Sequence, residues 1–196
     1  TQEKEADMYT ASDLKKGLKI EIDGDPCVIT DFQFSKPGKG QALYRCKIKN
    51  LNTGSTFDRT FRSVDKLDKP NLEERDKIYS YPEGNRYVFM DPETYEQLEI
   101  GEEMLGIQRY FLIEDMEVKI LFHNDRPLEI TLPNFVEQTI AETEPGARGD
   151  TATNVMKPAK TDYGYELQVP LFINTGDVIR IDTRTGEYND RVSKGG

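Results

Sequence analysis

Two lysines set among glycines and a proline are the side chains of this chain best placed for binding chemistry. They occur in the order Lys36, Pro37, Gly38, Lys39, Gly40. Residues 27–34 before them and 41–49 after them have the composition of β-strands. Pro37 presets one backbone angle of a turn, and glycine accepts a positive φ at little cost. We therefore expect a projecting hairpin that holds Lys39 at its end.

A lone ammonium at the end of a hairpin suits contact with phosphate or sugar in a narrow cleft. It would also be accessible to an enzyme that modifies lysine. The alternative is an exposed turn whose lysines serve only solubility. The loop by itself does not separate these readings, so the rest of the chain must do so.

Residue types that support catalysis or metal binding are scarce. The sequence has two cysteines, Cys27 and Cys46, one histidine, His123, and no CxxC pair. A Cys/His zinc site and a His-based catalytic triad are therefore not expected. Residues 36–40 lack the spacing and the following helix of a phosphate-binding loop. We predict a protein that is not an enzyme and has no metal or bound cofactor, with both thiols reduced and structural and His123 facing solvent at a strand end.

Charge is distributed unevenly along the chain. Residues 8–69 carry 12 basic and 8 acidic side chains (+4), residues 70–131 carry 6 and 15 (−9), and residues 132–196 carry 7 and 10 (−3). An acidic protein is a poor general nucleic-acid binder, because its own field opposes each phosphate contact. A basic first third could still meet RNA locally, with no affinity for DNA. The alternative, that the acidity serves only solubility, stays open here.

Strand patterns occupy almost the whole chain. Residues 18–22 alternate apolar and charged side chains, and residues 52–55 (NTGS) predict a second hairpin turn. Residues 100–106 are the only stretch that suggests a short helix, and strands are expected to follow at 110–113 and 118–122. These patterns predict an all-β protein.

Polar, proline-containing stretches divide these strands into three units of about 60 residues. We place a disordered extension at residues 1–7 and domains at 8–69, 70–132 and 133–196. Units this small are marginal alone, so the second and third are expected to pack together. Five-stranded OB barrels fit their size. Without a signal segment or an apolar stretch of transmembrane length, we expect a soluble cytoplasmic protein.

From about Met8 to the end, the chain resembles bacterial elongation factor P of the type with a lysine at its tip. One segment that carries the resemblance is residues 34–42 (FSKPGKGQA), and others are residues 149–152 (GDTA) and 186–188 (GEY). The most specific is the C-terminal signature, matched at Lys157, Ala159, Gly164, Leu167, Val169, Pro170, Ile173 and Gly176. Residues 166–173 also have the composition of a buried strand, so most of that signature is interpreted as architecture.

The resemblance implies an elongated, L-shaped, tRNA-like protein with a KOW/SH3-like barrel followed by two OB barrels. It implies a translation elongation factor that binds the ribosome between the P and E sites and stimulates peptide-bond formation at consecutive prolines. Lys39 matches the lysine that many bacteria lengthen covalently, often with a β-lysyl group, so that it reaches the CCA end of the P-site peptidyl-tRNA. A lysine-modifying enzyme is then a further partner, and we expect a monomer with no membrane contact.

The same resemblance implies contact residues. The tip residues Lys36, Pro37, Gly38, Lys39 and Gly40 would contact the acceptor end of the tRNA, with Arg45, Lys47 and Lys49 as a basic flank. Residues Gly149, Asp150 and Thr151 would lie near the E-site codon, the alternative being a turn without a ligand. Tyr188 and Arg191 are further candidates for ribosome contact.

Two other functions remain open at this stage. One is a paralogue of elongation factor P with a different duty. The other is an OB-fold protein that binds single-stranded RNA, which would need basic grooves lined by stacking aromatic side chains. The acidic second unit argues against the RNA-binding alternative.

Overall fold

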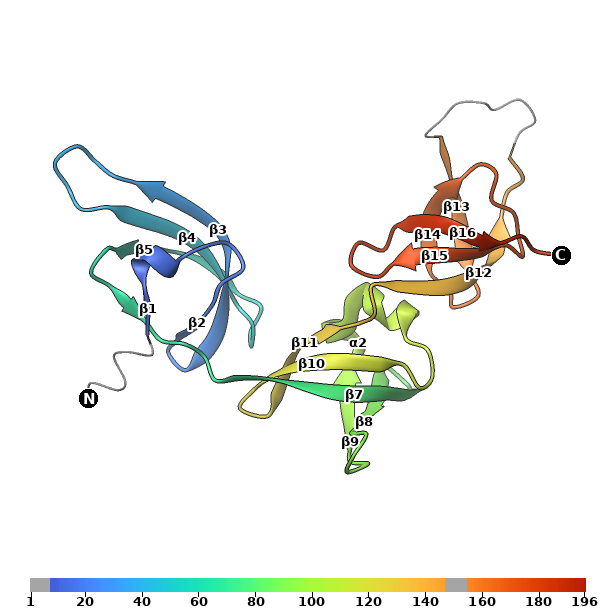
Figure 1. Cartoon of the computed structure of the whole chain (residues 1–196), viewed down its shortest axis with the longest axis horizontal. Helices are drawn as coiled ribbons and strands as arrows, with labels where there is room; N and C mark the ends of the chain where they lie inside the picture. The colour runs from blue at the N-terminus through green and yellow to red at the C-terminus, as the bar shows by residue number, and fades with distance from the viewer. Residues whose placement is uncertain (1–7, 147–154) are drawn as a thin grey trace. The chain divides into compact units, whose positions relative to one another are not determined.

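The structure is a computed structural model that describes residues 8–146 and 155–196, and its regular elements are almost all antiparallel strands (Figure 1). Its helical elements in these ranges are the α-helix α2 (Glu102–Leu105) and the 3-10 helices η1 (Ala11–Asp13) and η2 (Gly106–Phe111). The predicted all-β class is therefore confirmed. The chain divides into two compact units. The first runs to Glu74 and includes Leu121–Leu128, and the second contains Arg75–Ile120 and Glu129–Gly196.

The first unit is built on a four-stranded sheet. In spatial order it contains β2 (Lys19–Ile22), β3 (Asp25–Ser35), β4 (Leu43–Asn50) and β5 (Thr56–Arg62). A short pair, β1 (Tyr9–Thr10) with β6 (Lys66–Leu67), closes beside it. One face of the sheet is the core, where Ile20, Ile29 and Ile48 are fully buried. Along β4 the exposed Arg45, Lys47 and Lys49 alternate with the buried Cys46 and Ile48, as the period of a strand requires.

The distal half of β3 extends past this core. β2 pairs only with residues 25–28 of β3, and the register shifts between Ile29 and Asp31. A bulge of this kind bends the strand and increases its twist. Before the bulge β3 is largely buried, whereas from Asp31 to Ser35 it is mostly exposed. β3 and β4 therefore form a hairpin that continues beyond the part of the sheet that packs the core.

Two five-stranded sheets follow. The first has the order β11-β10-β7-β8-β9 and the second the order β14-β13-β12-β15-β16. Their strands are β7 (Leu72–Glu83), β8 (Arg86–Met90), β9 (Gln97–Gly101), β10 (Glu117–His123), β11 (Arg126–Thr131), β12 (Phe135–Thr143), β13 (Met156–Thr161), β14 (Glu166–Pro170), β15 (Val178–Asp182) and β16 (Tyr188–Ser193). The domain boundaries proposed at 69/70 and 132/133 stay predictions.

Within the second unit, η2 packs against the C-terminal sheet. The ring of Tyr165 meets Phe111 edge-on at 4.9 Å between centroids, and its hydroxyl donates to the carbonyl of Gly186 at 2.7 Å. The Gln138 side-chain amide donates to the carbonyl of Tyr110 at 2.7 Å. Gly186 has φ +77°, and a Cβ there would lie 2.3 Å from the Tyr165 hydroxyl. Only glycine fits this closely packed joint.

Two expectations about single elements are wrong. Residues 110–113 do not form a strand, because Tyr110 and Phe111 belong to η2 and pack against Tyr165. These apolar residues therefore form a 3-10 helix that packs against the C-terminal sheet. A strand-like alternation pattern does not predict packing of this kind. His123 does not face solvent, because it is 4% exposed and its Nε2 lies 3.4 Å from Glu21 Oε1 in the first unit. This contact joins residues 102 positions apart in sequence, so local patterns could not predict it.

Candidate functional site

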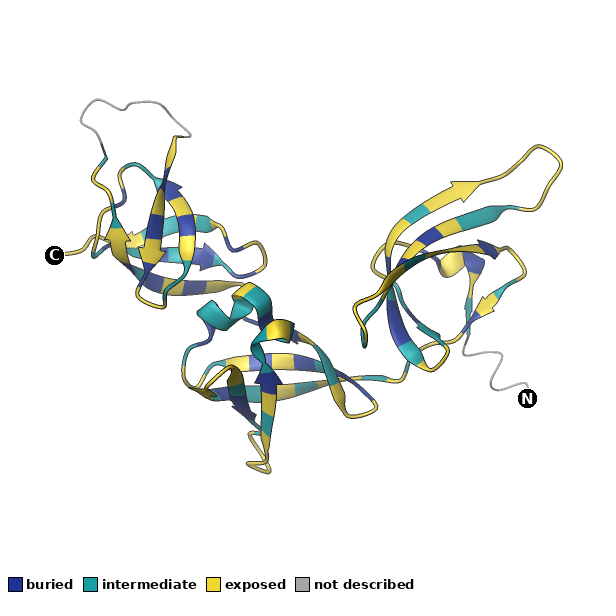
Figure 2. Ribbon diagram, turned by 180° about the vertical axis from the view of Figure 1, so that it is seen from behind, coloured by how far each residue is buried: buried dark blue, intermediate teal, exposed yellow. Residues whose placement is uncertain are grey.

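The loop that carries the two lysines is the most exposed end of the first unit. The last register pair of the hairpin is Ser35 with Leu43, and the chain between them turns through residues 36–42. The amide of Gly40 donates to the carbonyl of Pro37 at 3.0 Å, which closes the turn. Figure 2 shows this loop in the exposed colour, and residues 36–41 are all exposed. Lys39 therefore lies inside this turn, between Pro37 and Gly40.

In the described part of the chain, no other side chain holds the ammonium group of Lys39. Among the residues that the structure describes, neither Lys39 nor Lys36 has a hydrogen bond or an ion pair. No hydrogen bond or ion pair with a described residue therefore ties the Lys39 side chain to its own barrel. An ammonium in this state is available to a phosphate, to a sugar hydroxyl or to a modifying enzyme.

One expectation about the glycines beside Lys39, that they adopt a positive φ, is wrong. Neither Gly38 nor Gly40 has a positive φ, so the turn does not require glycine for its backbone conformation. A Cβ on Gly38 would meet nothing within 4 Å, and one on Gly40 would lie 3.5 Å from Pro37 Cγ, an ordinary contact. What the two glycines provide is a narrow tip without side chains beside Lys39.

Aromatic side chains support the stem of the hairpin. Tyr44 lies across from Phe34, with ring centroids 5.2 Å apart and an edge-on arrangement, and its ring stacks on Phe32 at 6.0 Å. Aromatic pairs across strands stabilise a sheet, so this stem does not depend on the loop for its conformation. Sequence reasoning missed this feature, although the spacing of the two phenylalanines indicates that they share a face.

The basic flank lies on the other face of the same hairpin. Arg45, Lys47 and Lys49 are exposed and alternate with buried residues along β4. In the register of the sheet, Lys47 stands between Asp31 on β3 and Asp58 on β5. These carboxylates offset its charge, whereas Arg45 has neutral neighbours, Gln33 and Thr60. A shallow cavity of about 230 Å³ opens at this place on the sheet. The flank is therefore less uniformly positive than the residue types suggest.

The second group of candidate residues cannot be placed. Gly149, Asp150 and Thr151 lie outside the residues that the structure describes. The C-terminal signature around them is largely interior, because Ala159, Leu167, Val169 and Ile173 are all buried. Lys157 is only 6% exposed, and its ammonium donates to the main-chain carbonyl of Glu144. This signature therefore builds the C-terminal sheet, as its apolar pattern predicted.

Tyr188 and Arg191 both belong to β16 and interact within their own sheet. The Arg191 guanidinium lies 3.6 Å from Asp177 and stacks over the ring of Phe172 at 5.0 Å. Burial would raise the pKa of Asp177, but hydrogen bonds from the amides of Asn174 and Gly195, together with Arg191, hold that pKa below its usual value. Burial raises the pKa of the Tyr188 hydroxyl, and Asp190 adds to this effect. Both residues have structural roles, and their contact with a ribosome stays a prediction.

Other chemistry is not assembled in the part of the chain that is described. No cluster of three or more His, Cys, Asp or Glu side chains there could hold a metal ion. Cys27 and Cys46 are both free and buried, and burial raises the pKa of each thiol. Among the described residues, no helix has the length and apolar character needed to cross a membrane.

Comparison with protein families assigns nearly all of the chain. The family model described as elongation factor P KOW-like domain matches residues 10–67. The elongation factor P OB domain matches residues 72–130, and the elongation factor P C-terminal model matches residues 129–191. The KOW-like class expected for the first domain and the OB class expected for the second are therefore confirmed.

Individual relatives agree with the family models. The chain is 51% identical to elongation factor P of Syntrophus aciditrophicus over 94% of this chain and 99% of that one. It is also 51% identical to elongation factor P of Desulfotalea psychrophila, over 95% of this chain and 100% of that one. Among solved structures, it resembles the eukaryotic translation initiation factor 5A from Methanococcus jannaschii. That likeness has a TM-score of 0.54 and 28% identity and covers 64% of this chain and 92% of the other.

Proposed function

The chain belongs to the elongation factor P family of ribosome-associated translation elongation factors, which are not enzymes, and we propose that it acts when consecutive prolines are joined. In this proposal it binds between the P and E sites as a monomer in the cytoplasm. Its tip loop then contacts the CCA end of the P-site peptidyl-tRNA. The observation that carries the proposal is the exposed Lys39 ammonium, held at the end of a stiff hairpin with no partner in the described part of the chain.

The proposed mechanism is positioning rather than chemistry. Proline is a constrained secondary amine that attacks poorly and distorts the nascent chain. A factor that restricts the peptidyl-tRNA to an attacking geometry lowers the barrier without donating or accepting a proton, and such positioning can be worth several kcal/mol. Contacts from Lys39 to the tRNA backbone fix position and carry no sequence code. The narrow tip made by Gly38 and Gly40 would let the loop enter a crowded cavity.

We propose that a lysine-modifying enzyme lengthens the Lys39 side chain, with a β-lysyl group as one possible product. The free ammonium and the absence of bulky neighbours on the loop support access for such an enzyme. Intact mass of the protein from its native host tests this step. We expect a mass above that of the sequence, with the increment located on Lys39, and an unmodified mass would contradict it.

Other contacts are proposed with less structural support. Residues 149–151 are proposed to lie near the E-site codon, and Tyr188 and Arg191 to touch the ribosome. Arg45 and Lys49 are better candidates for the tRNA backbone than Lys47, because Asp31 and Asp58 flank Lys47 in the sheet. Mutation of Arg45 should therefore weaken ribosome binding more than mutation of Lys47.

Purified translation of a template with three consecutive proline codons tests the proposed function. We expect the modified protein to increase the yield of full-length product from this template and to leave a proline-free template unchanged. Equal yields with and without the protein would contradict the proposal. Binding to free single-stranded RNA with a steep salt dependence, in place of ribosome binding, would instead favour a generic RNA-binding role.

A further inference from the structure

Three aromatic side chains form one row across the hairpin and its neighbouring strand. Phe34 on β3 pairs in register with Tyr44 on β4, and Tyr44 pairs with Phe61 on β5. Their exposure rises along the row: Phe61 is 8% exposed, Tyr44 is intermediate, and Phe34 is 55% exposed. The row thus starts in the core of the first unit and ends on its surface, at the strand that leads into the tip loop.

The core accounts for Phe61 but not for Phe34. Phe34 lies beyond the bulge in β3, where β2 no longer pairs with that strand. Its ring is held edge-on by Tyr44 at 5.2 Å, which fixes its position while more than half of the side chain stays in solvent. A polar residue would suit such a site in a solubilising hairpin. A fixed, exposed aromatic ring is instead a surface on which another flat group can stack.

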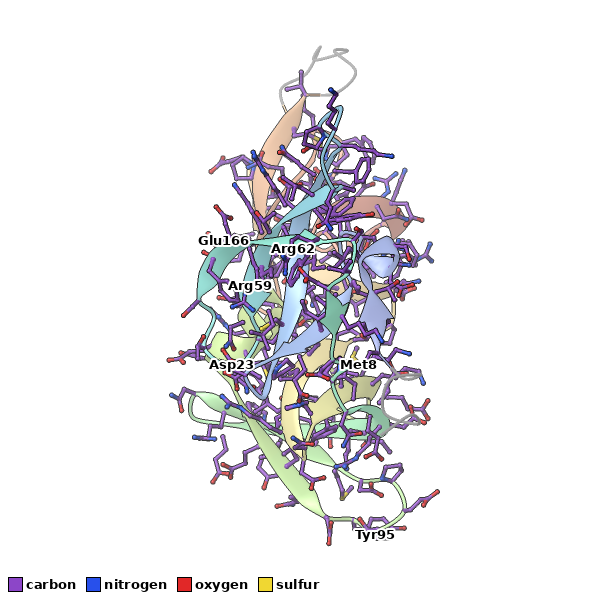
Figure 3. The ribbon with its side chains drawn as sticks, turned by 90° about the vertical axis from the view of Figure 1, so that its left-hand side faces the viewer. Met8, Asp23, Arg59, Arg62, Tyr95 and Glu166 are labelled. Atoms are coloured by element: carbon purple, nitrogen blue, oxygen red, sulfur yellow. The ribbon has the colours of Figure 1, made fainter. Side chains whose placement is uncertain are left out.

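The positive charges near the Phe34 ring indicate which kind of flat group would stack on it. Lys36 and Lys39 follow Phe34 by two and five residues, and both ammonium groups lack partners in the described residues. Arg59, labelled in Figure 3, is exposed, and by register it shares a face with Cys46; its guanidinium lies over the ring of Phe57 at 5.7 Å. Residues 8–69 carry a net charge of +4. Aromatic rings interleaved with cations are the arrangement that binds single-stranded nucleic acid.

We propose that Phe34 is the stacking surface for an unpaired base in the single-stranded 3′ end of the P-site tRNA. The proposal rests on the proposed function and adds a second contact to it, since Lys39 would hold the backbone while Phe34 holds a base. The basic flank leaves β4 from the opposite face, because Arg45 and Lys47 alternate with Tyr44 and Cys46. The hairpin would therefore present a ring on one face and backbone contacts on the other.

A series of substitutions at position 34 tests this role by the chemistry of the side chain. Phe34→Trp keeps a flat π face, whereas Phe34→Leu keeps an apolar side chain and loses that face. We expect Phe34→Trp to retain rescue of the three-proline template. Phe34→Leu should raise the concentration needed for half-maximal rescue by about fivefold or more, as the loss of one base–aromatic stack predicts. Rescue by Phe34→Leu at the wild-type concentration would overturn the proposal.

Two controls separate stacking from other effects. All proteins are matched for the extent of Lys39 modification, measured by intact mass. If the loss of rescue disappears after matching, Phe34 acts in recognition by the modifying enzyme, and the proposal is overturned. Tyr95→Leu is the matched control, because Tyr95 is a 70% exposed aromatic residue at the turn between β8 and β9 (Figure 3). It should rescue as well as wild type. Equal loss in Tyr95→Leu and Phe34→Leu would also overturn the proposal.

A contact measurement distinguishes failure of this inference from failure of the proposed function. The photoreactive amino acid p-benzoylphenylalanine is placed at position 34, and the protein is bound to ribosomes that carry P-site tRNA. We expect crosslinks to the last nucleotides of the tRNA. Crosslinks only to ribosomal protein or ribosomal RNA would overturn the stacking role even if the wild-type protein rescues translation. If the wild-type protein gave no rescue, the proposed function would fail whatever the crosslink.

Discussion

Lys39 and Lys157 both belong to motifs that resemble the same family, yet the fold uses them in opposite ways. Lys39 lies on an exposed loop with no partner in the described residues, whereas Lys157 is buried and donates to the carbonyl of Glu144. Burying a lysine costs desolvation free energy and side-chain entropy. A buried lysine is therefore expected to stabilise the fold through the contacts that it makes. A motif residue can therefore identify a family either through its contacts with a partner or through the fold alone.

Two glycines, Gly186 in the segment 186–188 and Gly40 in the tip loop, differ in the same way. Gly186 has a positive φ and leaves no room for a Cβ beside Tyr165 and Ile107. Gly40 has neither constraint. The packing around residue 186 thus requires a glycine, whereas the packing around residue 40 does not. Substitutions at these positions test the difference, because stability and rescue can be measured separately for each variant.

Gly186→Ala should give the largest loss of stability. The new Cβ meets the Tyr165 hydroxyl at a backbone conformation that side chains rarely adopt. Together these effects should lower the free energy of unfolding by about 2–4 kcal/mol. Urea denaturation followed by circular dichroism measures the change. A loss below about 0.5 kcal/mol, the range of ordinary surface substitutions, would show that the joint yields easily and would contradict the packing described here.

Lys157→Ala should have a smaller effect of the same kind. It removes a buried side chain and leaves the Glu144 carbonyl without its donor, at a cost of about 1–3 kcal/mol. Lys157→Met keeps most of the buried stem and should cost less, which separates packing from hydrogen bonding. Lys160→Ala, at an exposed lysine on the same strand, is the matched control. Equal denaturation midpoints for Lys157→Ala and Lys160→Ala would remove the structural role of Lys157.

Gly40→Ala should leave stability within about 0.5 kcal/mol of wild type, because its Cβ finds only an ordinary contact with Pro37. Rescue of the three-proline template should nevertheless fall, since in the proposed mechanism the tip enters a crowded cavity. Thermal unfolding and the translation assay measure the two quantities on one sample. A destabilised Gly40→Ala protein, or one with full rescue, would contradict the distinction between the two glycines.

Acid should weaken the C-terminal sheet through Asp177. Its folded pKa is lowered, so its stabilising contribution is present above the unfolded value of about 3.9 and is lost as pH falls through the folded value. The wild-type urea midpoint should therefore drop between pH 6 and pH 3, and Asp177→Asn should reduce that drop. An identical pH dependence in both proteins would contradict the contribution of the Asp177–Arg191 contact.

The sequence was most informative where side chains alternate locally. The strand composition of residues 41–49 predicted β4, alternation along residues 18–22 predicted β2, and the glycine–proline punctuation predicted the hairpin. It was least informative where distant segments meet. Buried His123 contacts Glu21, and Tyr110 and Phe111 in η2 pack against Tyr165, so neither arrangement could be predicted from neighbouring residues. The exposed Phe34 was visible as a strand residue, but its exposure depends on where β2 stops pairing.

The measurement that bears most directly on the role of Lys39 is rescue of three-proline synthesis by Lys39→Ala. Lys16→Ala, at an exposed lysine of the same unit outside the loop, is the matched control. We predict that Lys39→Ala abolishes rescue while its thermal unfolding midpoint stays at the wild-type value, and that Lys16→Ala rescues normally. Rescue by Lys39→Ala equal to that of wild type would contradict the role of the tip lysine.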